Sequence, residues 1–250
     1  MLKAESAVLH YGKRTVLDGT SLALGRGELV CLIGANGSGK STLLRALLGL
    51  LPLDGGRVTL EDAPISSLGS ALAKRVAYLP QGAGIPDMTV SELVLCGRFP
   101  HLSYPRRYRG EDRAAAQRAM ARVGIERLAD CPLSTLSGGE RQTAYIAMAL
   151  SCESDYILLD EPTTYLDPAH AAALLRLLRS LAAEGRGILS VMHDLPMAFD
   201  FADRILLLDG GRIALNAPPA EAALSPAVRA ALGVSVFPIP NEGIYACRYL

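Results

Sequence analysis

Short, strongly apolar runs alternate with amphipathic stretches along most of the chain. The run Tyr156–Leu159 is almost free of polar residues, which is typical of a strand covered on both faces in a parallel sheet. Similar runs at Gly27–Ile33 and Gly187–Met192 predict two further strands. Apolar residues at helical spacing predict helices at 41–51, 111–123, 138–151, 169–183 and 195–202. This alternation predicts an α/β core.

Weaker strand signals lie toward both ends of the chain. Short apolar segments at 8–11, 22–24, 57–60 and 76–79 are separated by polar residues and glycines. Segments 204–208 and 212–215 flank Asp209-Gly210-Gly211, which predicts a hairpin turn. From about residue 89 to residue 150 the pattern is helical, so we expect a helical subdomain inserted into the α/β core. The sequence assigns no role to the tail at 232–250.

Composition disfavours several classes of protein. The 250 residues carry 25 Lys and Arg against 25 Asp and Glu, which argues against a globally basic nucleic-acid binder and an acidic disordered tail. The five cysteines are far apart and form no CxxC pair, which argues against a disulfide framework or a zinc site. We expect buried free thiols in a reducing compartment. The sequence shows no signal-peptide pattern and no bilayer-spanning apolar stretch, which predicts a soluble intracellular protein.

Residues Gly34–Ser41, GANGSGKS, fit the phosphate-loop pattern GxxxxGK[ST] in full. They lie between a predicted strand and a predicted helix, which is the context that this loop requires. The glycines allow backbone N–H groups to wrap a β-phosphate, and the helix N-terminus adds partial positive charge. We expect Lys40 to reach the β- and γ-phosphates and the Ser41 hydroxyl to bind Mg²⁺. The candidate nucleotide-binding residues of this segment are Gly34, Asn36, Gly37, Gly39, Lys40, Ser41 and Thr42.

Two acidic residues follow the apolar run at 156–159. Asp160 ends the predicted strand, where its carboxylate can hold a metal directly or through water. Glu161 follows at once and is placed to orient or deprotonate an attacking water molecule. The chain therefore carries both halves of a nucleoside triphosphate site, the loop for the phosphates and the carboxylates for metal and water.

The segment Leu136–Gln142, LSGGERQ, resembles the signature motif of ABC-type ATPases. On physical grounds alone, Ser137 caps a helix, while Gly138 and Gly139 allow the backbone to approach an anion closely. The resemblance implies that this loop faces the γ-phosphate of a nucleotide held by a second copy of the chain. Two copies then enclose two ATP molecules.

Further positions match the family in its order, and the resemblance extends over residues 8–219. It implies that Tyr11 stacks on adenine and that Gln81 contacts Mg²⁺ or water. It also implies that Asp167 lies in a loop crossing the dimer interface and that His193 lies near the γ-phosphate. Catalysis is then assigned to Lys40, Gln81, Glu161 and His193, and Mg²⁺ binding to Ser41, Gln81 and Asp160.

The same resemblance implies a P-loop NTPase core, with a mostly parallel sheet, an antiparallel β portion at the N-terminus and an inserted helical signature subdomain. We expect a single domain over 1–250, in which 1–85 and 154–250 form the nucleotide-binding core and 86–153 form the helical subdomain. Thr143 and Met148 stand where the family often has basic residues on the signature helix. These departures concern helix packing and coupling rather than phosphate contacts.

The interval between Lys40 and Ser137 is too short for the coiled-coil or zinc insertions of repair and chromosome-organising ABC ATPases. A single cassette with no fused membrane domain looks like a bacterial importer subunit. Within that group, Leu95–His101 resembles the ATPases of ferric-siderophore, haem and cobalamin importers. We therefore expect an importer of an iron chelate, either a ferric siderophore or haem. A cobalamin, zinc, manganese or molybdate importer, and a soluble ABC ATPase without a membrane partner, remain open alternatives.

The resemblance also implies ligands, partners and place. The ligands are ATP and Mg²⁺, and the partners are a second copy, polytopic permease subunits and, indirectly, a periplasmic or surface binding protein, with no nucleic acid. The expected location is peripheral, on the cytoplasmic face of the inner membrane. Residues 98–127 hold eight arginines. This basic stretch is either a solvated helix face or a contact for permease loops or anionic headgroups.

Overall fold

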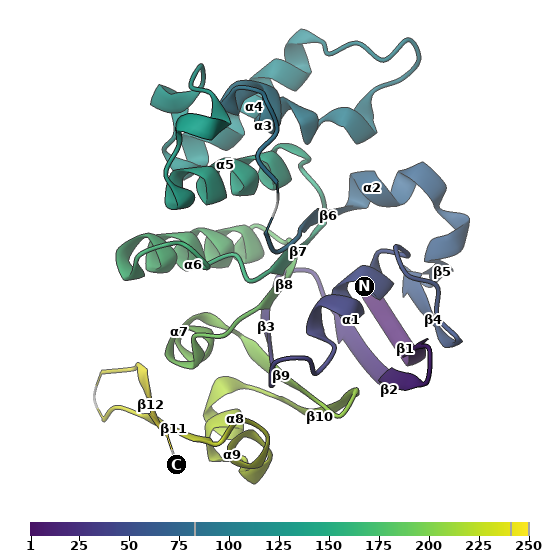
Figure 1. Cartoon of the computed structure of the whole chain (residues 1–250), viewed down its shortest axis with the longest axis vertical. Helices are drawn as coiled ribbons and strands as arrows, with labels where there is room; N and C mark the ends of the chain where they lie inside the picture. The colour runs from purple at the N-terminus through teal and green to yellow at the C-terminus, as the bar shows by residue number, and fades with distance from the viewer. Residues whose placement is uncertain (83, 241, 250) are drawn as a thin grey trace.

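A computed structural model describes residues 1–82, 84–240 and 242–249. Its centre is a six-stranded sheet of order β10-β9-β3-β8-β7-β6 (Figure 1). Strands β6 to β9 and β3 run parallel, and only β10 is antiparallel to its neighbour β9. The bounds are β3 Leu29–Ile33, β6 Val76–Leu79, β7 Tyr156–Asp160, β8 Gly187–Val191, β9 Arg204–Asp209 and β10 Arg212–Ala217. The predicted mostly parallel sheet is confirmed.

The central strands are buried on both faces, as their apolar sequences predict. Every residue of β3, β7 and β8 is buried. Side chains alternate between the faces of a strand, so Leu29, Cys31 and Ile33 join one core while Val30 and Leu32 join another. The first core packs under helices α5 (Gly138–Ser151) and α6 (Pro168–Ala183), and the second under α1 (Lys40–Leu47) (Figure 1).

A second, antiparallel sheet covers the α1 side, with strand order β2-β1-β4-β5. The strands are β1 Leu2–Tyr11, β2 Arg14–Leu24, β4 Gly55–Leu60 and β5 Ala63–Pro64. Register shifts interrupt the pairing of β1 with β2, so the apolar alternation is broken and the sequence predicted only fragments of this long hairpin.

Contacts at Gly211 join the two sheets. Its carbonyl accepts hydrogen bonds from the Asp18 backbone N–H at 2.9 Å and from the Thr20 hydroxyl. Arg212 donates to the Asp18 carboxylate from Nη2 at 2.8 Å. A β-carbon on Gly211 would lie 2.7 Å from the Val16 carbonyl oxygen, so the approach of the β9–β10 turn to β2 requires glycine.

The predicted end of the first helix is wrong. Sequence pattern placed it at Leu51, before Pro52, but α1 ends at Leu47. Gly49 follows with a φ of +67°, and the Gly49 and Leu50 amides bond back to the last turn of the helix. Glycine in this left-handed conformation terminates the helix before the proline can.

Helices form a layer above the sheet in Figure 1. They are α3 Val90–Cys96, α4 Gly110–Val123 and α5, with the short 3-10 turns η3 Phe99–His101, η4 Glu126–Leu128 and η5 Leu133–Thr135. α2 Leu72–Arg75, preceded by the 3-10 turns η1 Ile65–Ser67 and η2 Gly69–Ala71, lies instead on the side of the antiparallel sheet. The C-terminal elements are α7 Leu195–Phe201, α8 Pro219–Leu224, α9 Pro226–Leu232, β11 Val234–Pro238 and β12 Tyr245–Tyr249. No helix in the described ranges is long and apolar enough to cross a membrane.

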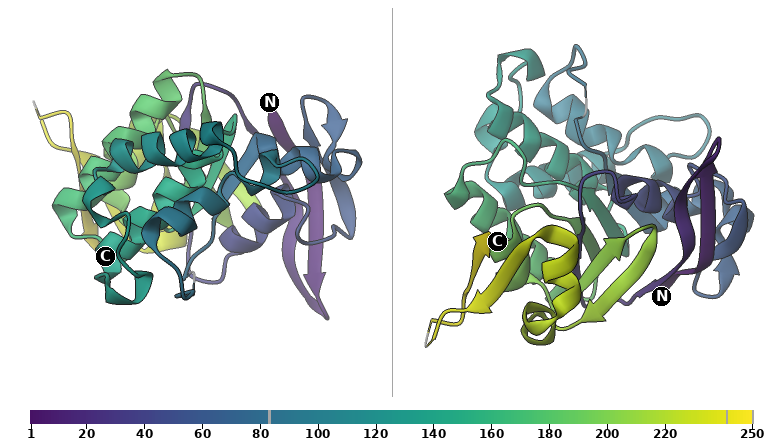
Figure 2. Two further views of the ribbon diagram at one scale, coloured as in Figure 1. Left: turned by 90° about the horizontal axis from the view of Figure 1, so that it is seen from above. Right: turned by 60° about the horizontal axis from the view of Figure 1, so that its bottom comes forward.

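The described residues of the tail at 232–250 pack on the core. Residues 241 and 250 of this tail, and residue 83 of the predicted core segment 1–85, lie outside the described residues. Strands β11 and β12 form a hairpin next to α7 and α8 (Figure 2). The Tyr245 ring lies 5.5 Å from the Phe199 ring, and the Tyr245 N–H donates to Asp200 Oδ1 at 2.7 Å. Val234 and Val236 are buried in the main core.

The five cysteines are free, but only Cys31 and Cys152 are buried. Burial raises the pKa of the Cys31 thiol to about 12. Cys96 is exposed at the end of α3, while Cys131 and Cys247 are half-buried. The expectation of buried thiols is therefore wrong for these three, because periodicity does not reveal the exposure of a helix end or an edge strand.

Replacing Gly97 with Ala is expected to destabilise the fold by about 3 kcal/mol. A β-carbon there would lie 2.1 Å from the Met148 carbonyl oxygen and 2.2 Å from Ser151 Oγ, so α3 and α5 would have to separate. Chemical denaturation measures the change. Gly110→Ala is the matched control, since its β-carbon meets nothing within 4 Å. Equal stability of the two variants would contradict the close packing.

Candidate functional site

The loop between β3 and α1 is folded so tightly that only glycine fits at two of its positions. A β-carbon on Gly34 would lie 2.3 Å from the Leu208 carbonyl oxygen. Gly39 has a φ of +106°, and its β-carbon would lie 2.9 Å from the Val16 carbonyl oxygen. The loop thus closes onto β9 and β2 and leads directly into the N-terminus of α1, where backbone N–H groups are free to meet an anion.

Lys40, the first residue of α1, places its ammonium group inside this loop. Nζ donates to the carbonyl oxygens of Gly34 at 2.8 Å and Ala35 at 3.0 Å. Burial lowers the pKa of the Lys40 ammonium, while the nearby carboxylates of Glu161 and Asp160 raise it. A fixed positive charge in a cradle of backbone dipoles suits a phosphate ligand.

Asp160 ends β7 next to α1 and is buried. Its Oδ1 accepts a hydrogen bond from Ser41 Oγ at 3.1 Å, while its buried Oδ2 has no partner among the described residues. Burial raises the pKa of Asp160, and the Ser41 hydrogen bond opposes this. An unsatisfied carboxylate oxygen beside a hydroxyl is a donor set that suits Mg²⁺.

The described residues contain no group of three or more His, Cys, Asp or Glu side chains able to hold a metal alone. Ser41 and Asp160 could hold Mg²⁺ only together with phosphate oxygens of a nucleotide and water, which would supply the remaining ligands. The residues present therefore fit a nucleotide-bound Mg²⁺, and do not fit a free-standing metal centre.

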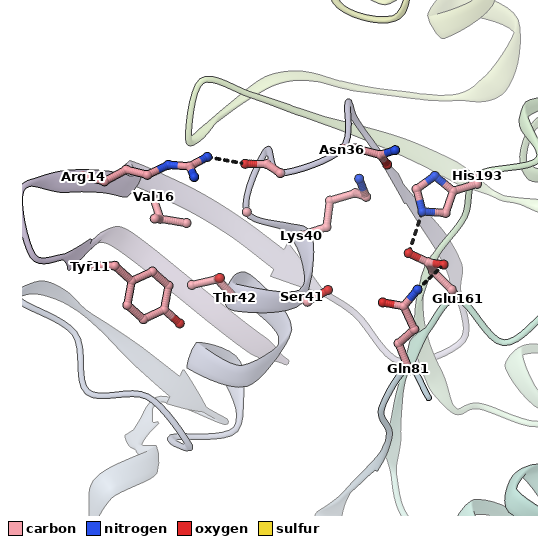
Figure 3. Close-up of a pocket in the computed structure, with 12 residues that line it drawn as sticks. Tyr11, Arg14, Val16, Asn36, Lys40, Ser41, Thr42, Gln81, Glu161 and His193 are labelled. Atoms are coloured by element: carbon pink, nitrogen blue, oxygen red, sulfur yellow. Dashed lines mark hydrogen bonds and ion pairs between the residues drawn. The ribbon is translucent and has the colours of Figure 1, made fainter. Parts of the chain in front are cut away.

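Three polar side chains meet just beyond the ends of three neighbouring strands. Gln81 follows β6, Glu161 follows β7 and His193 follows β8. Gln81 Nε2 donates to Glu161 Oε2 at 2.7 Å, and His193 Nε2 lies 2.5 Å from Glu161 Oε1 (Figure 3). Glu161 also has a φ of +55°, an unusual conformation for a residue other than glycine. The carboxylate is thus held in one orientation from both sides.

These residues line one cavity of about 620 Å³. In Figure 3, Lys40 and Ser41 lie at its centre, the Glu161 group at one side, and Tyr11 on the opposite side. Tyr11 is half exposed. The sequence-predicted residues in the lining are Tyr11, Asn36, Gly37, Gly39, Lys40, Ser41, Thr42, Gln81, Glu161 and His193. Gly34 instead lines an adjoining cavity behind Asn36 and His193.

Sequence reasoning missed two residues of this cavity, Arg14 and Val16. Arg14 Nη2 donates to the Gly37 carbonyl oxygen at 3.1 Å, so β2 braces the phosphate loop (Figure 3). Both residues lie at the start of β2, in the hairpin that the apolar pattern did not reveal. In the sequence, the one indication that they belong to the cavity was their position three and five residues after Tyr11.

The remaining predicted residues lie elsewhere. Ser137 caps α5, accepting from the Glu140 N–H at 3.3 Å in a capping box, and Asp167 caps α6, accepting from the His170 N–H at 2.9 Å. With Gly138, Gly139 and Tyr165 they line a separate cavity of about 680 Å³. One chain therefore presents two separate surfaces, a phosphate-loop cavity and a signature-loop cavity.

This fold and this cavity define a P-loop nucleoside triphosphatase with an inserted helical layer. Comparison of sequences extends the result: the profile of the ABC transporter family matches residues 17–164. The chain belongs to the ABC transporter family. It is accordingly an ATP-binding protein and an ATPase linked to transport, which confirms the predicted enzyme class.

Two curated relatives match most of the chain. The probable siderophore transport system ATP-binding protein YusV of Bacillus subtilis is 42% identical over 223 residues, 88% of this chain and 81% of the relative. The hemin import ATP-binding protein HmuV of Streptomyces coelicolor is 41% identical over 239 residues, 94% of this chain and 85% of the relative.

Two solved structures share the fold. An ABC transporter described as of a metal-chelate type, in an inward-facing conformation, matches with a TM-score of 0.84 at 26% identity, covering 100% of this chain and 96% of that one. A dimeric bacterial ABC transporter cassette matches with a TM-score of 0.78 at 28% identity, covering 88% and 99%. The predicted P-loop fold is confirmed, and the dimeric cassette supports a second copy as a partner.

Proposed function

We propose that this chain is the ATP-hydrolysing subunit of a bacterial importer for an iron chelate, either a ferric siderophore or haem. The ATPase activity in this proposal is supported by one observation: Gln81 and His193 both contact Glu161 at the edge of the phosphate-loop cavity. The cargo follows from the printed functions of the relatives, a siderophore system and a hemin importer. Cobalamin, zinc, manganese and molybdate are the alternative cargoes.

In this proposal the cavity hydrolyses the bond between the β- and γ-phosphates. The backbone of Asn36, Gly37 and Gly39 wraps the β-phosphate, while Lys40 contacts the β- and γ-phosphates. Glu161 aligns a water molecule and accepts its proton as the water oxygen attacks the γ-phosphorus. The bridging oxygen departs with ADP, and phosphate is released. His193 holds Glu161 in position and lies beside the γ-phosphate.

Ser41, Asp160 and Gln81 hold Mg²⁺ in this assignment, and Thr42 and Gly34 complete the contacts of the loop. The bound metal neutralises charge on the β- and γ-phosphates. The unpartnered Oδ2 of Asp160 supports its place in this set. Since Asp160 already accepts a bond from Ser41, the two oxygen donors are oriented before substrate binds.

The second cavity serves the partner's nucleotide. Ser137, Gly138 and Gly139 face the γ-phosphate held by the other copy, and Asp167 lies at the interface between copies. This arrangement needs two copies for two complete sites. Residues 86–153 act as the helical subdomain that responds to the permease, against a core formed by 1–85 and 154–250. The assembly lies on the cytoplasmic face of the inner membrane and works with permease subunits and a periplasmic or surface binding protein.

Affinity purification tests this proposal. Tagged Glu161→Gln protein with ATP is isolated from detergent-solubilised membranes of its host, and copurifying proteins are identified. A polytopic membrane protein together with an iron-chelate binding protein is the expected result. Reproducible recovery of soluble proteins, ribosomes or DNA alone would remove the transport assignment while leaving the ATPase chemistry in place.

Tyr11→Ala is expected to weaken ATP binding by about 10-fold, because stacking of one base on an aromatic ring contributes about 1–3 kcal/mol. Tyr11→Phe retains the ring and serves as the control. Titration calorimetry with ATP and with inorganic triphosphate measures the effect. If Tyr11 stacks on adenine, triphosphate binds both variants equally; an equal loss for both ligands would assign Tyr11 to loop packing instead.

A further inference from the structure

η3 and the segment that connects it to α4 form a basic projection, which we name the basic arm and define as residues 99–109. It projects beyond the helical layer at the top of Figure 1. Tyr104, at its tip, is 96% exposed. Arg106, Arg107 and Arg109 are also exposed, so three of four consecutive residues carry positive charge into solvent.

The base of the arm is held by buried polar contacts. Asp112 of α4 is buried, and it accepts from Arg98 Nε at 3.2 Å and from the Arg109 backbone N–H at 2.9 Å. Buried Arg98 also donates to the Ser151 carbonyl oxygen at 2.9 Å. His101 Nε2 lies 2.8 Å from the Cys152 carbonyl oxygen. The Asp112 carboxylate therefore joins the two ends of the arm, and Arg98 attaches this base to α5.

The charges of the arm are not neutralised within the described parts of the chain. Two exposed arginines of the same helical layer, by contrast, are paired: Arg118 with Glu153, and Arg122 with Glu184. Within the described residues, Arg106, Arg107 and Arg109 form no ion pair with a carboxylate. Instead, the Arg106 guanidinium lies 4.6 Å from the centre of the Phe99 ring, which is itself 48% exposed. These exposed guanidinium groups are therefore free to bind an anionic partner.

The shape of the arm favours a lipid surface over a protein segment as its binding partner. None of the five cavities described for this chain includes a residue of the arm. A protein interface requires a close-packed, complementary centre, whereas a lipid surface accepts a convex tip. Tyrosine suits the interfacial region of a bilayer, and guanidinium groups bind phosphate oxygens in pairs.

We propose that the basic arm contacts the anionic phospholipid headgroups of the membrane directly, through Arg106, Arg107 and Arg109 with Tyr104 entering the interface. This contact supplements the permease and holds the helical layer against the bilayer. It does not depend on the identity of the cargo or on ATP hydrolysis.

Vesicle sedimentation with the full chain tests the proposal. Vesicles of phosphatidylcholine with about one third phosphatidylglycerol are compared with phosphatidylcholine alone. The wild-type chain is expected to bind the anionic vesicles, and R106E/R107E/R109E is expected to lower the partition coefficient by about 100-fold. Raising the ionic strength to about 0.5 M should also weaken binding of the wild type.

Three further variants make the test specific. R176E/R229E/R248E introduces the same charge change at exposed arginines away from the arm and should retain most of the binding. R106K/R107K/R109K keeps the charges and should bind within about 10-fold of wild type. Tyr104→Ala should weaken binding with no change of charge.

Thermal unfolding and ATPase activity of each variant report separately on folding and on the proposed function. Equal vesicle binding by the wild type and the arm triple-glutamate variant would overturn the proposal. It would also be overturned if that variant kept its vesicle binding but lost permease copurification, because the arm would then be a protein contact. An inactive ATPase that still binds vesicles through the arm would refute the proposed function alone.

Discussion

Glu161→Gln is expected to reduce ATP turnover by about 10³-fold while leaving ATP binding intact. The amide keeps the size and part of the hydrogen bonding of the carboxylate, but it cannot accept the proton of an attacking water molecule. Gln81 and His193 both contact Glu161 through its two oxygens, at 2.7 Å and 2.5 Å, so the substituted side chain stays oriented. Because hydrolysis fails after ATP has bound, the variant should accumulate as an ATP-bound dimer.

Steady-state phosphate release and size-exclusion chromatography with ATP measure these two effects. Glu184→Gln is the matched control, since Glu184 pairs with Arg122 on the surface and is remote from the cavity. It should keep wild-type turnover. Turnover by Glu161→Gln at the wild-type rate would remove Glu161 from the catalytic set, and loss of turnover without an ATP-dependent dimer would separate catalysis from dimerisation.

Lys40→Ala is expected to weaken ATP binding by about 100-fold, with loss of turnover at ordinary ATP concentrations. The ammonium is already directed into the loop by the carbonyl oxygens of Gly34 and Ala35, so its contacts to phosphate need little reorganisation. Its removal also takes away a positive charge that acts on Asp160 and Glu161, so their negative charge then repels the phosphates more strongly.

Titration of Lys40→Ala with ATP and with adenosine distinguishes the loss of a phosphate contact from a collapse of the loop. Adenosine binding should be unchanged, because adenosine has no phosphate for Lys40 to meet. Lys74→Ala, on the exposed surface at the end of α2, should match wild type for both ligands. Equal loss of adenosine and ATP binding by Lys40→Ala would indicate collapse of the loop rather than loss of a phosphate contact.

The strand ends that carry Asp160, Glu161 and His193 could be predicted, because the local sequence pattern there agrees with the arrangement of the strands in the sheet. Asp160 and Glu161 follow the apolar run Tyr156–Leu159, and His193 follows the mainly apolar run Gly187–Met192. Parallel neighbours in a sheet end at the same edge, so these side chains meet wherever the strands pair. The structure adds the order of the strands, which places Gln81 on the far side of Glu161 from His193. The functional roles of these residues stay predictions.

Other features could not be predicted because they depend on contacts distant in sequence. Arg14 reaches Gly37 across the face of the hairpin, and no local pattern records that contact. The tail becomes a hairpin through its packing on α7, where Tyr245 meets Phe199. The helix end at Leu47 was missed because proline is a conspicuous terminator, whereas Gly49 could as well have continued the helix at modest cost.

The link at Gly211 has a mechanical consequence. The antiparallel and parallel sheets share hydrogen bonds there through Asp18 and Thr20, so we expect them to move together. We therefore expect the spacing between Tyr11 and Lys40, which our proposal assigns to base and phosphate, to change little when the molecule moves. The helical layer is joined to the two sheets where the chain passes from β6 into the helices and where it returns to β7. We expect motion of the layer to be taken up at these two crossings, and Gln81 lies at the first of them.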